Sequence, residues 1–413
     1  MRREEMLRPV DEANLVLDHS GQVNVFLIAG LLGPGGFVFE HGGLDLVVLR
    51  EAVRRRIADI PALCQVPVPV GRRHEWAERQ PDLRLHVRLL PRIDDLSDLE
   101  LRCAELMVEP LPRSRPLWEL LVAPTPAGAA VIFRIHHAIA DGIAAAEVVR
   151  RLLDDDAHSP APPVQPPAPR SSPMDRLGAA LFGVRRTVTT LTARGLPDTV
   201  LLGARSCHHG VIFADADLER IRATAHGDAA TVNDAILAVA AAGYRAALTQ
   251  AGGPMPAELP VSVPVALERR GASRNQVGVM LVRLPLDAAS PHEALARIAA
   301  QTRIQKVQAR QQGTLELMRG PLGARVMDRI AHRQHLVGGF VTNVPGPDHR
   351  LSMAGAALLQ LWPVAVLAAN VRLGVAAVSY AGRLCLGVHF DAGYLDEAVV
   401  SAAIRRELVA LTS

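Results

Sequence analysis

The chain has 413 residues, a length that favours two lobes, either of which could bury a core of its own. Hydrophobic residues make up 49% of it and aromatic residues only 3%, a globular composition that excludes a disordered protein. The net charge is only +3 and the basic residues are spread along the chain, which excludes a nucleic-acid-binding protein. The cysteines form no C-x-x-C pair, so we expect them reduced and mostly buried: Cys64, Cys103, Cys207 and Cys385.

The ends and apolar stretches of the chain bear on its location. Residues 1–12 include acidic side chains and no apolar segment, which is unlike a signal peptide. The longest apolar region, residues 353–380, is interrupted by Gln360, Pro363 and Asn370, so we expect buried strands there and no transmembrane helix. We expect a cytoplasmic protein whose contact with a membrane or lipid droplet is at most peripheral.

Residues 1–153 show a mixed pattern of strands and helices. Apolar runs predict strands over residues 23–32, 115–122 and 129–135, the first ending in a glycine-rich turn. Helical spacing predicts helices over residues 46–60, 96–111 and 143–153. Apolar and charged residues alternate over residues 83–88, which predicts a half-buried strand. The segment reads as a first α/β lobe.

Residues 154–173 are rich in proline, which removes backbone donors and favours extended chain. We interpret them as a semi-rigid tether between the first lobe and a second lobe at residues 174–413. Residues 174–194 predict an amphipathic helix that packs on the core, although its basic flanks also suit a helix lying on anionic lipid.

The second lobe alternates strands and helices, again an α/β pattern. Strands are predicted over residues 211–214, 259–267, 277–286, 340–343, 371–380 and 384–390. Helices are predicted over residues 231–248, 291–311 and 395–411, with Thr231 as an N-cap and Pro291 in a first turn.

The stretch from Val131 to Gly142 is the strongest candidate for chemistry. An apolar strand runs into His136 and His137, and neighbouring side chains of a strand point to opposite faces. Only one of the two can therefore act in a given cavity, and His137 shares the face of the preceding apolar residues. Three interpretations compete: a structural strand end, a metal site and a catalytic base. The metal interpretation is weak, because the other histidine pair, at residues 208–209, also diverges.

The sequence His136-His137-Ala138-Ile139-Ala140-Asp141-Gly142 resembles the H-H-x-x-x-D-G signature of the coenzyme A-dependent acyltransferase superfamily, which includes chloramphenicol acetyltransferase. More of the chain resembles one branch, the bacterial wax ester synthase/diacylglycerol acyltransferase family. The further matches follow the family's order over nearly the whole chain: Pro116 to Glu119, Asn233-Asp234, Gly271 to Val277, Thr342 to Pro347, Ser379 to Gly382, Leu386 to Val388, and Asp391.

Two features depart from that family. Where members usually carry an Asp before the Arg that precedes Pro-Leu-Trp, the chain has Leu111-Pro112-Arg113, a change that affects packing. Between Val364 and Val375 many members have a glycine-rich polar stretch, whereas this chain is rich in Ala and Leu. The second difference lies where the acceptor pocket is expected.

The resemblance implies a fold of two chloramphenicol-acetyltransferase-like α/β lobes, each a two-layer sandwich, with an active-site channel between them. It implies that His137 removes a proton from an acceptor hydroxyl as that oxygen attacks an acyl-CoA thioester, without an acyl-enzyme. Acyl-CoA is then a co-substrate, with no bound cofactor and no metal. The acceptor is diacylglycerol or a long-chain alcohol, giving triacylglycerol or wax ester.

The other site candidates have supporting roles. His136, Asp141 and Gly142 are expected to shape the loop around His137. Candidates for substrate contact are Asn233, Asn275, Trp118 and Ser379, with Asn233 also a candidate for the oxyanion region. For the two asparagines, helix capping or turn formation is an equal alternative.

Other functions remain open at this stage. The same fold could acylate a sugar or a polyketide hydroxyl. A non-catalytic member could bind acyl lipids or coat lipid droplets, although the intact His137 and Gly142 argue against it. His136 and Asp141 also fit the H-x-x-x-x-D pattern of glycerol-phosphate acyltransferases, but those enzymes share neither this fold nor the later motifs.

Overall fold

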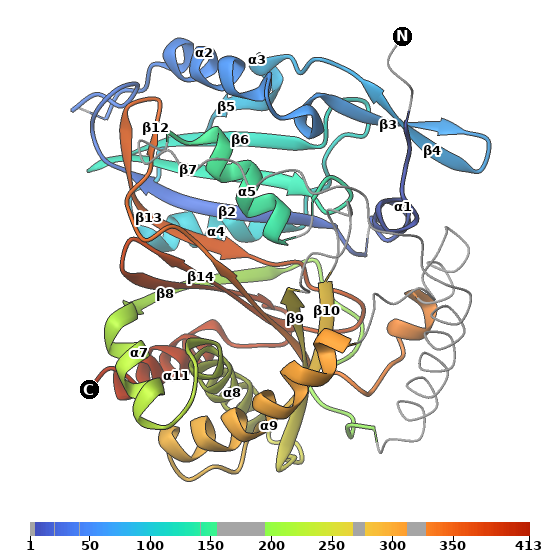
Figure 1. Ribbon diagram of the computed structural model, residues 1–413, viewed down its shortest axis with the longest axis vertical. Helices are drawn as coiled ribbons and strands as arrows, with labels where there is room; N and C mark the ends of the chain where they lie inside the picture. Colours follow the sequence, from blue (N-terminus) through green and yellow to red (C-terminus); the bar gives the residue numbers. More distant parts are fainter. Residues whose placement is uncertain are drawn as a thin grey trace.

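A computed structural model describes residues 5–19, 21–40, 42–140, 142–154, 195–266, 277–311 and 328–413. Two six-stranded sheets form the two halves of the molecule (Figure 1). The predicted α/β fold is therefore confirmed. The predicted tether beyond Asp154 and the predicted helix at residues 174–194 lie outside the described residues.

The first sheet is built mainly from the first 136 residues of the chain. Its strands are, in spatial order, β12 (Ser352–Met353), β13 (Ala356–Val364), β2 (Val25–Leu32), β7 (Gly128–His136), β6 (Trp118–Thr125) and β5 (Val87–Leu89). Neighbours pair antiparallel except for the parallel pair β5 and β6. Strands β12 and β13 come from the far end of the sequence, and in Figure 1 they stand in orange among the blue and cyan strands. The division into lobes at residue 174 stays a prediction.

The two faces of this sheet are packed differently. Val131, Phe133 and Ile135 of β7 lie in one core with α2 (Leu46–Ile57) and α5 (Gly142–Leu152). The intervening Ala130 and Ile132 lie in another core with α4 (Leu96–Met107). The alternation of a strand thus gives β7 two buried faces, which is why most of its residues are apolar and all of them are buried.

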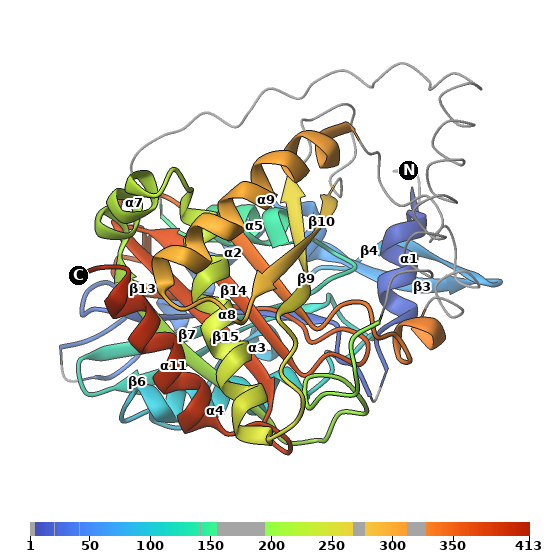
Figure 2. The same ribbon diagram turned by 90° about the horizontal axis from the view of Figure 1, so that it is seen from below.

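The second sheet belongs to the later part of the chain. Its order is β10 (Val277–Pro285), β9 (Glu258–Ala266), β11 (Gly339–Pro345), β14 (Leu373–Tyr380), β15 (Arg383–Asp391) and β8 (His209–Asp217). The sheet is mixed, because β11 pairs parallel with both of its neighbours. Its helices are α7 (Leu218–Gly227), α8 (Val232–Ala251), α9 (Pro291–Gln311) and α11 (Glu397–Ala410), of which α8 packs against α9 and α11 (Figure 2).

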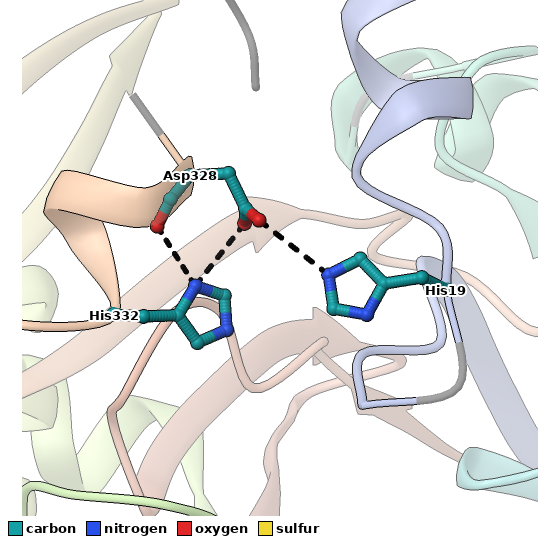
Figure 3. Close-up of side chains that lie close together, drawn as sticks. All are labelled: His19, Asp328 and His332. Atoms are coloured by element: carbon teal, nitrogen blue, oxygen red, sulfur yellow. Dashed lines mark hydrogen bonds and ion pairs between the residues drawn. The ribbon is translucent and has the colours of Figure 1, made fainter. Parts of the chain in front are cut away.

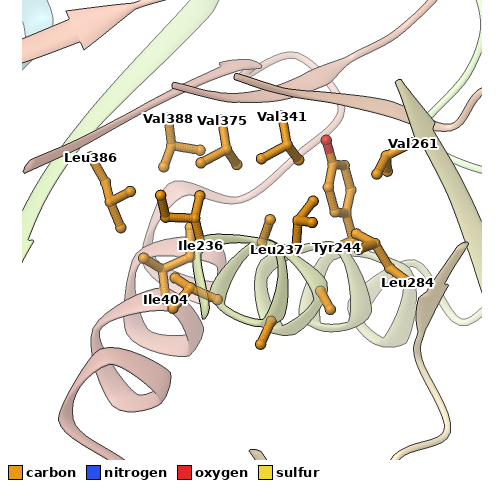
Figure 4. Close-up of a cluster of buried hydrophobic side chains, with 14 of the residues drawn as sticks. Ile236, Leu237, Tyr244, Val261, Leu284, Val341, Val375, Leu386, Val388 and Ile404 are labelled. Atoms are coloured by element: carbon orange, nitrogen blue, oxygen red, sulfur yellow. The ribbon is translucent and has the colours of Figure 1, made fainter. Parts of the chain in front are cut away.

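The core of the second half is aliphatic, as the composition predicts. Ile236 and Leu237 of α8 point at Val341, Val375 and Val388 of the sheet (Figure 4). The other buried residues of α8 are mostly alanine, which allows α9 and α11 to approach it closely. The one aromatic ring drawn in this view belongs to the buried Tyr244, whose hydroxyl donates to the Leu373 carbonyl at 3.0 Å.

Helix α8 begins where the sequence predicts. The Thr231 side chain accepts from the backbone N–H of Asp234, and the Asp234 carboxylate accepts the Thr231 N–H at 2.8 Å, which makes a capping box. The second carboxylate oxygen accepts the Thr302 hydroxyl of α9 at 2.7 Å. Asp234 therefore fixes the helix start and joins two helices.

The two halves are joined by a shared apolar core. It contains Phe213 of β8 and Trp362 of β13, whose rings are stacked with centroids 4.8 Å apart. At Gly387 of β15 an added Cβ would lie 1.8 Å from the Pro363 carbonyl, so only glycine permits β13 to pass this closely. The Glu100 carboxylate of α4 accepts the Phe213 N–H at 2.6 Å. Apolar packing and a polar link thus connect the sheets.

Some elements differ from the sequence-based expectation. The predicted strand over residues 83–88 is wrong in its first half, which forms α3 (Leu83–His86) because the Asp82 side chain caps it by accepting the Arg84 N–H. Helix α1 was expected only as an early helix without a position, and α7 was missed. A small sheet was also missed; its strands are, in spatial order, β1 (Glu5–Met6), β4 (Arg73–Glu78) and β3 (Gln65–Val70). Among the described residues, the helices are too short or too polar to span a bilayer.

Candidate active site

The histidine pair lies in a turn between β7 and α5. Strand β7 ends at His136, and the carbonyl of His136 accepts the Ile139 N–H at 3.0 Å. Helix α5 then begins at Gly142. Asp141, between turn and helix, lies outside the described residues, so its predicted role in shaping the loop stays a prediction.

His136 is fully buried and makes contacts within and beyond its own loop. Its Nδ1 lies 3.0 Å from the Ala138 N–H, which can only donate, so Nδ1 is the acceptor. Nε2 faces the Asp18 carboxylate, whose Oδ2 lies 3.4 Å away, but makes no hydrogen bond within the geometric limits to any described residue. The ring of His136 is thus directed into the support of the turn.

Asp18 follows helix α1 (Pro9–Val16) and is surrounded by donors. Burial raises the pKa of its carboxyl, but the contact with His136 and hydrogen bonds from the Asn24 N–H and Arg113 outweigh it, so the pKa is lowered. Arg113 also donates to the backbone carbonyls of Leu15 and Asp18, at 2.7 and 2.8 Å. The carboxylate is therefore ionised at neutral pH and fixed in place.

The backbone of His137 is held on both sides. Its N–H donates to the carbonyl of Asn24 at 2.9 Å, and its carbonyl accepts the Asn14 side-chain amide at 3.3 Å. Asn24 in turn donates from its side chain to the Asn14 carbonyl at 3.0 Å. The position of His137 is therefore set by α1 and by the entry to β2.

The His137 ring is half-buried and lies on the ring of Phe26, with centroids 4.3 Å apart. Phe26 packs against the core that contains Phe133 and Ile135, which is the face that strand alternation predicts. Nδ1 of His137 is buried without a partner on another described residue. The side chain as a whole is partly exposed, so Nε2 is the ring nitrogen that we expect to meet a substrate.

The pKa of His137 is lowered to about 4, mainly because the ring is buried; a hydrogen bond to its own backbone opposes the lowering, and the neighbouring His136 contributes to it. The ring is therefore neutral at physiological pH, with a lone pair available to accept a proton. A neutral, positioned imidazole with one accessible nitrogen is what general-base chemistry requires.

The structure does not bring all of the predicted substrate-contact residues to this loop. Trp118 is fully buried in the core of the first sheet, where its indole N–H donates to the Leu63 carbonyl at 2.9 Å and its ring lies 4.5 Å from that of His86. It has no exposed edge for a substrate. Its place in the sequence motif is explained by packing.

Ser379 is half-buried near the end of β14, and its hydroxyl accepts the Gly346 N–H at 3.2 Å. An added Cβ at Gly346 would lie 2.3 Å from the Ser379 carbonyl, so these two motif residues pack on each other. The adjoining Ala381 and Gly382 have positive φ values of 45° and 80° and form the tight turn to β15.

For the two predicted asparagines, Asn233 and Asn275, the structure gives no contact with His137. Asn233 is half-buried in the first turn of α8, where its side chain makes no hydrogen bond to another described residue. Asn275 lies outside the described residues. Their predicted roles in substrate contact stay predictions.

Sequence reasoning missed the residues that support the histidine turn: Asn14, Asp18, Asn24 and Arg113. The available signal was the group of polar side chains shortly before the apolar strand at residues 23–32. Their use depends on α1 lying beside the end of β7, a tertiary contact.

Comparison with known proteins matches the chain twice to one family. Residues 12–193 match the wax ester synthase/diacylglycerol acyltransferase catalytic domain, and residues 274–411 match the WS/DGAT C-terminal domain. A probable diacylglycerol O-acyltransferase of Mycobacterium tuberculosis is 31% identical over 372 residues, which cover 80% of each protein.

Solved structures share the fold over almost the entire chain. The wax ester synthase/diacylglycerol acyltransferase of Marinobacter aquaeolei VT8 has a TM-score of 0.73 at 22% identity and covers 98% of each chain. The trichothecene 15-O-acetyltransferase of Fusarium sporotrichioides has a TM-score of 0.68 at 13% identity, over 99% of this chain and 94% of that one. The matches to both domains and to the mycobacterial relative show that this chain belongs to the wax ester synthase/diacylglycerol acyltransferase family.

Proposed function

We propose that His137 is the general base with which this O-acyltransferase transfers a fatty acyl group from acyl-CoA to the hydroxyl of diacylglycerol or of a long-chain alcohol. The observation that carries the proposal is the state of His137: a neutral ring on a backbone fixed at both sides, in a side chain that is partly exposed although its Nδ1 is buried. His136 has both nitrogens directed into the support of the turn, so it is a positioning residue.

In the proposed reaction, Nε2 of His137 takes the proton of the acceptor hydroxyl while that oxygen forms a bond to the thioester carbonyl carbon. The tetrahedral intermediate then collapses as its C–S bond breaks, and the CoA thiolate takes the proton back from His137. The products are the ester and CoA-SH. A thiolate leaves readily, so the step needs no covalent acyl-enzyme.

The acceptor follows from the family and from the relative. The family name includes both diacylglycerol and wax ester chemistry, and the mycobacterial relative is named a diacylglycerol O-acyltransferase. We therefore assign diacylglycerol as the first acceptor to test and a long-chain alcohol as the second. Acyl-CoA is the donor, in line with a structurally similar condensation domain that was solved with C8-CoA.

Such acceptors dissolve in lipid, so the protein has to meet a lipid surface. Large apolar side chains are exposed on adjoining elements of the first half: Val47 on α2, Leu85 on α3 and Leu89 on β5. We assign them as the surface that makes a peripheral contact with lipid.

Flotation with liposomes should fall for the double variant Val47→Asp/Leu89→Asp. It should be unchanged for Val409→Asp, a control on the exposed side of α11. Equal flotation of all three proteins would remove this assignment.

Activity is tested by incubating the purified protein with palmitoyl-CoA and either diacylglycerol or hexadecanol. Released thiol and ester product are both measured, because thiol release alone also reports thioester hydrolysis. His137→Ala should lose about 10²- to 10⁴-fold in rate, the contribution typical of a general base. His292→Ala, at an exposed histidine of α9, is the matched control and should keep full activity. Equal ester formation by His137→Ala and wild type would refute the proposal.

A further inference from the structure

A second group of titratable side chains lies where the two halves of the molecule meet. His19 lies in the loop after α1, and Asp328 and His332 lie in the segment before β11 (Figure 3). One ring nitrogen of each histidine and one carboxylate oxygen of Asp328 lie within 4.8 Å of one another. We propose that these three residues bind a divalent transition-metal ion of the zinc class, which fastens the loop of His19 to the second half of the protein.

The distances fit convergence on one ion. Nε2 of His19 lies 3.6 Å from Oδ2 of Asp328, and Nδ1 of His332 lies 3.2 Å from Oδ1 of the same carboxylate. The two imidazole rings are 5.9 Å apart between centroids and face the carboxylate from different sides (Figure 3). Two imidazoles and a carboxylate form the ligand set that zinc and its neighbours accept, with a fourth position left for water.

Local structure sets each ligand in position. The His332 N–H donates to the Asp328 carbonyl at 2.9 Å, a helical contact that places these two side chains on one face. His19 lies in a tight turn, because its N–H and carbonyl are both bonded to the backbone of Gln22. Between a fifth and two fifths of each side chain is exposed, so an ion can reach the group from solvent.

Three contacts work against an ion and have to change or be offset. Nδ1 of His332 donates to the backbone carbonyl of Asp328 at 2.8 Å, so an ion on Nδ1 displaces this hydrogen bond and moves the ring proton to Nε2. The Gly21 N–H approaches Nδ1 of His19 at 3.2 Å, so a metal on Nε2, which moves the ring proton to Nδ1, displaces this contact. Gly21 is exposed and its N–H can bond to water instead. The partly buried Arg205 interacts electrostatically with Asp328, but its guanidinium is already occupied by the carbonyls of Gly21 and Leu367.

The location gives the site a structural role. The turn of His19 already contacts the second half through Gln22, whose side-chain oxygen accepts the Ala369 N–H at 2.7 Å. The same short segment carries Asp18 and Asn24, which support the turn of His136 and His137. A bound ion therefore stabilises the inter-lobe contact and the segment that positions the proposed base, without touching substrate.

The test uses Zn²⁺ and Co²⁺ as probes on full-length protein treated with EDTA and dialysed. All proteins carry Cys207→Ser, because that exposed thiol lies 3.6 Å from a nitrogen of His208 and could bind zinc by itself. We expect one Co²⁺ per chain with the visible absorption of nitrogen and oxygen ligands, and a higher unfolding temperature with Zn²⁺, reversed by EDTA.

His19→Ala and His332→Gln should each weaken Zn²⁺ binding at least about tenfold. His292→Ala removes an exposed histidine whose ion pair among the described residues is with Asp228, so it should bind Zn²⁺ like the Cys207→Ser protein. The reference is the protein that carries Cys207→Ser alone. If it binds Zn²⁺ no more tightly than the His19→Ala variant, the proposal is wrong and the three residues form an ordinary ion-pair cluster. If a variant does not fold, the proposal is tested on the Cys207→Ser protein alone: one bound Co²⁺ with the spectrum of nitrogen and oxygen ligands supports the site, and no bound Co²⁺ refutes it. None of these readouts depends on acyl transfer, so they are independent of the proposed function.

Discussion

The carboxylate of Asp18 lies 3.4 Å from Nε2 of His136, and the next residue, the partly exposed His137, is the proposed base. The support of the proposed base thus begins in a different part of the sequence, more than a hundred residues earlier. Arg113 and the Asn24 N–H complete the surroundings of this carboxylate.

Asp18→Ala should lower kcat without changing the KM for acyl-CoA. The variant removes the acceptor that holds His136, so the turn of His137 shifts, and a displacement of about 1 Å can cost about 10²-fold in rate. Asp18→Asn keeps an acceptor oxygen and should recover part of the loss. Steady-state kinetics with varied acyl-CoA measure both parameters. A rise in KM with unchanged kcat would show that Asp18 acts on binding and not on the position of His137.

The pH dependence of kcat/KM should reflect the lowered pKa of His137. Burial lowers that pKa to about 4, so the base is unprotonated and active above it, and activity is lost only as the pH falls towards 4. An ordinary histidine would lose activity around pH 6.5. We expect a flat profile between about pH 5.5 and 8, measured with circular dichroism to detect acid unfolding. An inflection near pH 6.5 would contradict this assignment.

Glu100 should contribute to the contact between the two halves. It accepts the Phe213 N–H of β8, an edge strand of the second sheet, at 2.6 Å, and burial raises its pKa. Glu100→Ala leaves this N–H without a partner and should reduce the free energy of unfolding by about 1–3 kcal/mol, while Glu100→Gln keeps an acceptor and should lose less. Glu105→Ala, on the exposed face of α4, is the control and should change it by at most about 0.5 kcal/mol. Urea denaturation distinguishes the three variants.

The thiols should react unequally. Cys207 is exposed, whereas Cys64, Cys103 and Cys385 are buried, and burial raises the pKa of all three buried thiols. A thiol reagent should therefore label Cys207 rapidly in native protein and the other three only after unfolding. Labelled protein should keep its acyltransferase activity, because the proposed reaction uses no cysteine. Loss of activity that Cys207→Ser prevents would indicate that Cys207 lies closer to the substrate path than we propose.

Much of the fold follows from local sequence. The buried runs that became β2, β7 and β14, the start of α9 at Pro291 and the N-cap Thr231 are all set by periodicity, burial and capping, which act within a few residues. The identification of His137 over His136 also follows from strand alternation and from the family resemblance. Where local rules competed, as at residues 83–88, the cap by Asp82 prevailed over an alternation that also suits a strand.

The sequence by itself therefore determined most of the elements and pointed to the family and to the proposed base. Only the tertiary structure decided that β13, from beyond residue 350, pairs with β2, and that Asp18 and Asn24 support the histidine turn. It likewise brought His19 to Asp328 and His332, and placed Trp118 in the core. These contacts join residues far apart in the chain, and no short-range pattern encodes them, because a strand or a polar side chain gains its partner only when the sheets have packed together.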